Sequence, residues 1–163
     1  MGVSRPAHLD PALLGLVVLG GAAGAATRYG LTLAIDSSGW PWATWTVNLS
    51  GAFLLALLTG WLAARGPDAG RRRAVRLLLG TGFLGAYTTY SALAVDTERL
   101  LADGRWAAAL TYALSTALLG LAATLAGLRV AAALADRSRT ANEGRTADDP
   151  RTPDDARATG GAA

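Results

Sequence analysis

The chain has 163 residues and a formal net charge of +3, and 52% of its residues are hydrophobic whereas only 17% are charged. A soluble domain usually carries about 25% charged residues, so this composition is poor in the polar groups that a water-facing surface needs. The chain has no cysteine and a single histidine, His8. These counts exclude a disulfide scaffold, a thiol nucleophile and a cysteine-ligated metal site, and they argue against histidine-based catalysis.

Four windows of the sequence are nearly free of charged residues, and each is near or above the length of about 20 apolar residues that a membrane-spanning helix needs. We therefore predict an all-α integral membrane protein with four transmembrane helices, at about residues 11–35, 42–63, 75–95 and 106–130. A soluble helical bundle would need a polar face on each helix, and these segments lack one. The first segment extends well past the apolar region of a signal peptide, so we predict that it is not cleaved.

The last part of the chain has no large apolar residue and is rich in Pro, Gly, Thr, Asp and Arg. Such a segment cannot bury enough apolar surface to offset its loss of conformational entropy. We predict a four-helix membrane domain over residues 1–135 and a disordered polar tail over residues 136–163.

The distribution of arginines predicts the orientation in the plasma membrane. The loop at residues 64–76 contains five arginines and others lie near both termini, whereas the opposite side has only Arg99 and Arg105, with Arg28 inside the first helix near that side. Basic residues favour the cytoplasmic side, so both termini are predicted to be cytoplasmic. A basic cluster can also bind anionic lipid or nucleic acid. Membrane topology is the favoured interpretation of the arginine cluster, with lipid binding as the alternative, and we predict no nucleic-acid partner.

Small residues and one arginine distinguish the first helix. Gly20 and Gly24 are four residues apart, a spacing that lets helix backbones approach closely. Arg28 is either a fixed positive charge that draws anions into an aqueous vestibule or a side chain that snorkels to the interface.

Polar side chains also interrupt the second and fourth helices. Asn48 needs a partner within the membrane, which is either a neighbouring helix or a polar groove that it lines. In the fourth helix Tyr112, Ser115, Thr116 and Gly120 share one face. That face either packs against the second helix or lines a pore.

The third helix is a poor continuous helix, because glycines at positions 80, 82 and 85 are followed by Thr88 and Thr89. A break at this point would free backbone carbonyls, which can ligate a hard cation, and such a break is tolerated where protein or water covers it. The alternative is a flexed helix that packs against its neighbours.

Carboxylates are absent from all four windows. A proton-coupled exporter usually needs one there. The absence of a carboxylate pair, together with the cysteine and histidine counts, predicts that the chain is not an enzyme.

Three motifs in order resemble the fluoride channel family known as Fluc or CrcB. The first is Gly20-Gly21 and Gly24-Ala25 followed by Arg28-Tyr29, the second is TWTVNLSGAF at residues 44–53, and the third is GFLGAYTTYS at residues 82–91. The resemblance covers about residues 11–132.

The resemblance implies a passive, fluoride-selective channel built as an antiparallel, dual-topology dimer with a broken third helix. It implies a sodium ion at the dimer centre, held by backbone carbonyls at Gly85 and Thr88. It maps the pore asparagine to Asn48, the two pore phenylalanines to Tyr90 and Leu93, and the vestibule arginine to Arg28. It also implies pore hydroxyls at Ser91 and Tyr112. The neighbouring Thr89 hydroxyl is a further neutral donor that would suit fluoride.

Leu93 carries no ring, so the third motif departs from the family's pattern. Together with the arginine bias, this suggests that the chain is one half of a heterodimer with an oppositely oriented homologue, a homodimer being the alternative. A small multidrug transporter of four-helix dimer type is a further alternative, but its mechanism needs a carboxylate in the first helix, where the only candidate is Asp10 at the edge.

Overall fold

The computed structural model describes residues 10–147, and all regular elements in that range are helices. They are, in chain order, α1 (Pro11–Ala34), α2 (Trp42–Ala64), α3 (Gly70–Val75), the π-helix η2 (Arg76–Leu84), α4 (Gly85–Tyr87), α5 (Tyr90–Ala102) and α6 (Trp106–Ala147).

Three of these helices are long and apolar enough to cross a membrane: α1, α2 and the part of α6 from Trp106 to Ser138. The bounds of α1 and α2 agree with the predicted segments to within one residue at each end. At the start of α1, Asp10 accepts a hydrogen bond from the Ala12 amide at 2.9 Å, and Pro11 occupies the first helical turn, where its missing N–H costs nothing.

The third predicted segment is longer than expected and is divided into several helices. Helical structure begins at Gly70 and ends at Ala102, with an interruption at Thr88 and Thr89, whose backbones are extended. The Thr89 hydroxyl then caps α5 by accepting a hydrogen bond from the Ala92 amide at 3.1 Å.

Helix α6 differs from the prediction at its C-terminal end. It continues past residue 135 to Ala147, whereas a disordered tail was predicted from residue 136. The segment 136–147 contains Ala, Arg and Glu, which have high helix propensity, and it continues a helix that is already formed, so no new nucleation is required. Residues 148–163 of the predicted tail lie outside the described residues.

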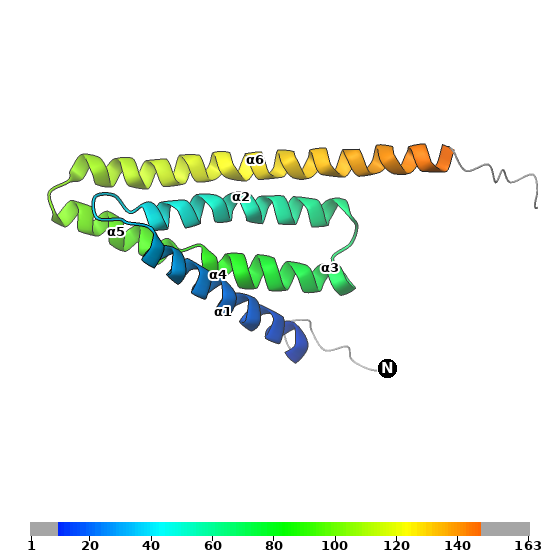
Figure 1. The fold of residues 1–163 in the computed structure, drawn as a ribbon, viewed down its shortest axis with the longest axis horizontal. Coiled ribbons are helices and arrows are strands. Elements are labelled where there is room, and N and C mark those ends of the chain that lie inside the picture. The colour runs from blue at the N-terminus through cyan, green and yellow to red at the C-terminus, as the bar shows by residue number, and fades with distance from the viewer. Residues whose placement is uncertain (1–9, 148–163) are drawn as a thin grey trace, which may run out of the picture.

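The helices pack side by side, with α2 along α6 and with η2 and α4 against α1 (Figure 1). Glycines allow the close approach of α1 to η2: a Cβ on Gly20 would overlap the Leu78 carbonyl, and one on Gly24 would overlap the Phe83 carbonyl. The predicted small-residue spacing is therefore used for helix packing.

The two ends of the molecule carry different connections. The start of α1, the α2–α3 loop and the end of α6 lie at one end, and the α1–α2 and α5–α6 connections lie at the other (Figure 1). The five arginines of residues 64–76 therefore lie at the same end as the start of α1.

Candidate functional site

Asn48 of α2 holds the interruption between α4 and α5. Its Nδ2 donates to the Thr89 carbonyl at 2.9 Å, and its Oδ1 accepts from the Thr89 amide at 2.8 Å. One side chain thus satisfies both backbone groups of a residue that has left the helix, where an unpaired buried group would be costly. The predicted polar residue of α2 therefore has a backbone partner.

Arg28 of α1 reaches the same interruption from the other side. Its Nε donates to the Ala86 carbonyl at 3.1 Å, and the group is partly buried. The structure therefore brings Arg28 and Asn48 to two sides of one break, although they are far apart in the sequence.

The carbonyl groups of Gly85 and Thr88 lie on the two sides of the turn that ends α4. The Thr88 amide donates to Leu84 and the Thr89 amide donates to Asn48, so neither bonds to Gly85. Within residues 10–147, no hydrogen bond reaches the carbonyl oxygen of Thr88, which lies outside the helices.

Tyr87 and Gly51 pack the break against α2. The Tyr87 hydroxyl lies 2.9 Å from the Ser50 hydroxyl, within hydrogen-bond distance. A Cβ on Gly51 would overlap the Thr88 methyl group and lie 3.2 Å from the Tyr87 ring, so a larger residue would push the break away from α2. A cavity of about 650 Å³ lies beside this contact and is lined by Asn48, Thr88 and residues of α2 and α6.

The two positions that the resemblance assigned to pore aromatic rings differ in exposure. Tyr90 is 83% exposed, so its ring lies on the surface of the single subunit. Leu93 is partly buried and packs against the cluster of Leu100, Ala109 and Tyr112. Between them, the Ser91 hydroxyl is exposed and lies 3.2 Å from the Thr89 hydroxyl.

Tyr112 is fully buried in the subunit and belongs to a polar cluster centred on Asp96. Its hydroxyl donates to Asp96 Oδ2 at 3.4 Å, and the Thr44 hydroxyl donates to the same oxygen at 2.7 Å. Its ring meets that of Trp40 edge to face at 5.6 Å. On the same face Ser115 accepts from the Trp45 indole N–H at 3.2 Å, so this face of α6 packs against α2 and the α1–α2 connection.

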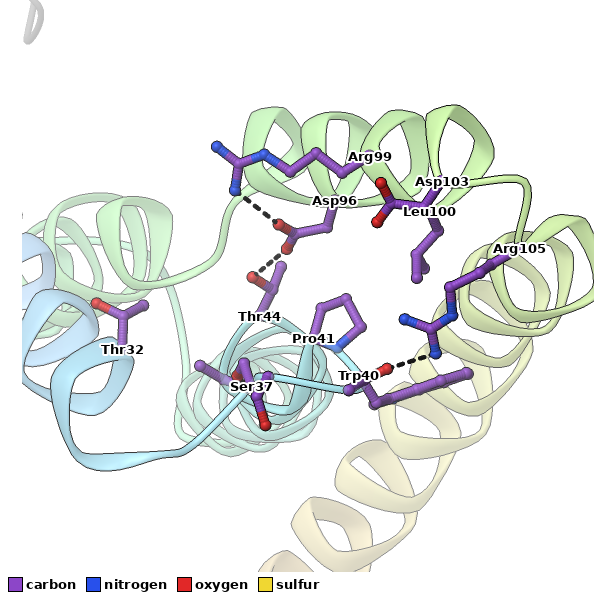
Figure 2. Close-up of a pocket in the computed structure, with 13 residues that line it drawn as sticks. Thr32, Ser37, Trp40, Pro41, Thr44, Asp96, Arg99, Leu100, Asp103 and Arg105 are labelled. Atoms are coloured by element: carbon purple, nitrogen blue, oxygen red, sulfur yellow. Dashed lines mark hydrogen bonds and ion pairs between the residues drawn. The ribbon is translucent and has the colours of Figure 1, made fainter.

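The Asp96 carboxylate opens onto a polar cavity of about 350 Å³ (Figure 2). Residues of the α1–α2 connection and the end of α5 line this cavity. Figure 2 shows Asp96 between the Thr44 hydroxyl and Arg99, whose Nη1 lies 3.9 Å from Asp96 Oδ1. Arg105 also lines the cavity and donates to the Gly39 carbonyl at 2.7 Å.

Sequence reasoning missed Asp96 because the search for charge-free windows treated it as a boundary. A usable signal was present, since Asp96 lies three residues after Leu93 and therefore on the same face of α5.

The profile described as "CrcB-like protein, Camphor Resistance (CrcB)" matches residues 15–128. The chain belongs to the CrcB-like family. It is 45% identical over 139 residues, or 82% of this chain and 93% of the relative, to a protein of Leifsonia xyli named fluoride-specific ion channel FluC 2. It is 46% identical over 120 residues, or 71% of this chain and 84% of the relative, to fluoride-specific ion channel FluC 1 of Cutibacterium acnes. A Caulobacter protein named fluoride-specific ion channel FluC is 40% identical over 71% of this chain and 91% of the relative.

The matched region of this CrcB-like chain contains the whole break and the groups that hold it. The residues that meet at the break are Arg28, Asn48, Gly85, Thr88 and Thr89. Tyr112 and Leu93 instead meet in the separate cluster near Asp96.

Proposed function

We propose that this chain forms a fluoride-selective passive channel that carries cytoplasmic fluoride out of the cell and so lowers its toxicity. One observation carries the proposal: the chain is 45% identical to a protein named as a fluoride-specific ion channel, over 93% of that protein's length. A membrane potential that is negative inside favours exit of the anion by about 2.3 kcal/mol per 100 mV, so neither ATP nor a proton gradient is needed.

The polar groups near the break support a conduction path of neutral donors. Conduction needs sites that replace the hydration water of the ion and still release it, and hydroxyl and amide groups bind more weakly than a fixed charge. The Asn48 amide, the Thr89 and Ser91 hydroxyls and the exposed Tyr90 ring supply such groups, since an aromatic ring presents a positive edge. Leu93 and Tyr112 would line the continuation toward Asp96 and the polar cavity.

The resemblance implies Na⁺, and the donor set at the break fits it. The Gly85 and Thr88 carbonyls would hold the ion, because backbone oxygens beside a break in a helix suit this cation. Its charge would neutralise the carbonyl dipoles and stabilise the break. Replacing Na⁺ by N-methylglucamine during purification is then expected to lower the thermal stability of the protein. Equal stability in the two buffers would count against this site.

In the proposed assembly, each subunit crosses the membrane four times, and the residues on both sides of the break form the third crossing. Two such subunits pair in antiparallel orientation. Two subunits would cover the break and the cavity beside Asn48, which face outward in one subunit. A homodimer needs both orientations of the same chain. The arginine bias favours a heterodimer with an oppositely oriented homologue, of which this chain alone would be a non-conducting half.

A multidrug transporter is less well supported, because α1 contains no carboxylate and Asp10 serves as its cap.

The deciding experiment is efflux from liposomes that contain the purified chain, read with a fluoride electrode and with chloride as the control anion. Fast efflux of fluoride alone supports a homodimeric channel. No efflux, followed by efflux when the oppositely oriented homologue is added, supports the heterodimer. If no fluoride efflux is measured with the chain alone or with the added homologue, the channel proposal is wrong.

A further inference from the structure

Two cavities meet at the arginine-rich end of the molecule. The first, of about 450 Å³, is almost entirely apolar and is lined by residues of α2 and η2 together with Leu134 of α6. The second, of about 600 Å³, lies around the α2–α3 loop and includes Arg65, Arg71 and Arg72. Trp61 lines both, so a continuous surface leads from leucine side chains to guanidinium groups.

Asp68 is the only acid in the loop at residues 64–76, and two of the five arginines of this loop form ion pairs with its carboxylate. Arg76 donates to both of its carboxylate oxygens, at 3.0 and 2.7 Å, and Arg73 lies 3.8 Å from it. The hydrogen bond from Arg76 holds the pKa of Asp68 below its usual range, so the carboxylate stays charged at neutral pH. Neither Arg73 nor Arg76 lines the second cavity.

A third arginine, Arg72, closes the loop. It donates to the Pro67 carbonyl at 3.1 Å and to the Arg65 carbonyl at 2.7 Å, which satisfies backbone acceptors at the end of α2. The other two guanidinium groups of this cavity, those of Arg65 and Arg71, form no ion pair with any acid in the part of the chain that the structure describes. Arg65 lies over the Trp61 ring at 3.9 Å, and Arg71, which is exposed, makes no hydrogen bond to the described residues.

We propose that these two cavities together bind one anionic phospholipid. Its phosphate would lie between Arg65 and Arg71, and an acyl chain would lie in the first, apolar cavity, which we call the groove. Trp61 would lie where the headgroup meets the chain, a depth at which tryptophan is favoured in membranes. A free phosphate would leave the groove exposed, and an acidic protein segment would not fill a surface of leucines. A lipid satisfies both parts, and the groove lies in segments predicted to cross the bilayer.

The test compares lipid retention by the full chain in detergent, measured by native mass spectrometry with added phosphatidylglycerol or phosphatidylcholine. We expect phosphatidylglycerol to be retained preferentially. Replacing both Arg65 and Arg71 by Gln should weaken its retention by about fivefold for each arginine. The matched control is Arg73→Gln, which removes one charge from the same loop but outside the cavity, and it should change retention by less than about twofold. An equal effect of Arg73→Gln would mean general attraction to a basic loop and would overturn the site.

The groove is tested separately. Leu79 is 42% exposed and lines the groove, so Leu79→Trp should fill it and reduce phosphatidylglycerol retention. Leu119 of α6 is 45% exposed and lines neither cavity, and Leu119→Trp should leave retention unchanged. If Leu79→Trp leaves lipid retention intact but dissociates a dimer, the groove is an interface between copies and the proposal is wrong. Loss of retention with both tryptophan variants would also overturn it.

Discussion

Asn48 replaces, with one side chain, two backbone hydrogen bonds that the chain loses where α4 ends. An amide is suited to this because it carries a donor and an acceptor side by side. No other side chain hydrogen-bonds to the backbone of Thr89 within the described part of the chain. The break is thus held by a specific residue and does not follow from backbone flexibility alone.

Asn48→Ala is expected to leave the Thr89 amide and carbonyl unpaired, at about 1–3 kcal/mol for each group. The midpoint of thermal unfolding in detergent should fall, and fluoride efflux should fall with it. Thr27→Val is the control, because the Thr27 hydroxyl only donates to Ala23 within its own helix. An Asn48→Ala protein as stable as the Thr27→Val protein would show that water replaces the amide without cost.

Asp96 has a comparable role at the polar cavity, where it accepts from both Thr44 and Tyr112. Asp96→Ala should destabilise the protein by about 1–3 kcal/mol, because two hydroxyls lose their acceptor. Asp96→Asn keeps one acceptor oxygen and should cost less. Asp103→Ala, at an exposed carboxylate in the same cavity, should change stability by less than about 0.5 kcal/mol. If Asp96→Ala behaves like Asp103→Ala in thermal unfolding, the cluster does not stabilise the fold.

Helices α1 and η2 pack backbone to backbone, and this contact depends on the absence of side chains. Gly20 and Gly24 face the carbonyls of Leu78 and Phe83, and Gly82 faces back, with its would-be Cβ 2.7 Å from the Val17 carbonyl. Since backbone atoms cannot move aside as a flexible side chain does, added volume must separate the helices.

Gly24→Ala is therefore expected to destabilise the protein by about 1–3 kcal/mol and to displace η2, which leads into the break. Gly30→Ala in the same helix is the matched control, because a Cβ there meets nothing within 4 Å. That substitution should be neutral or stabilising by up to about 1 kcal/mol, since alanine is the better helix former. Thermal unfolding of the two variants measures the difference. Equal midpoints would contradict the close contact.

Hydrophobicity and charge predicted the positions of α1 and α2, because each helix is bounded by turn residues and polar groups, such as Asp10 and Pro11 at the start of α1. They could not predict the π-helix at Arg76–Leu84, whose wider turns depend on packing partners that single-residue propensities do not contain. The two-sided bond between Asn48 and Thr89 was also beyond a linear pattern. A polar residue within a span predicts a partner but does not identify it.

At the scale of the whole molecule, the two ends differ in charge. One end carries the arginine loop, in which a single acid compensates five bases. The other has Arg99 and Arg105, of which Arg99 lies beside Asp96. Basic loops favour the cytoplasmic side during insertion, so in the proposed dimer this asymmetry is expected to restrict which partners the chain can meet.

The chain is accordingly expected to insert in one orientation, with both termini in the cytoplasm. A C-terminal fusion to a fluorescent protein that matures only in the cytoplasm should fluoresce, and a fusion to a phosphatase that is active only outside should be inactive. Replacing Arg65, Arg71 and Arg73 by Gln should mix the orientations and give signal from both reporters, while Arg72 and Arg76 still hold the loop. Arg99→Gln, on the opposite side, should leave the orientation unchanged because it strengthens the bias. If the unaltered chain already gives both signals, it can pair with itself in antiparallel fashion, and the argument for an obligate partner of opposite orientation fails.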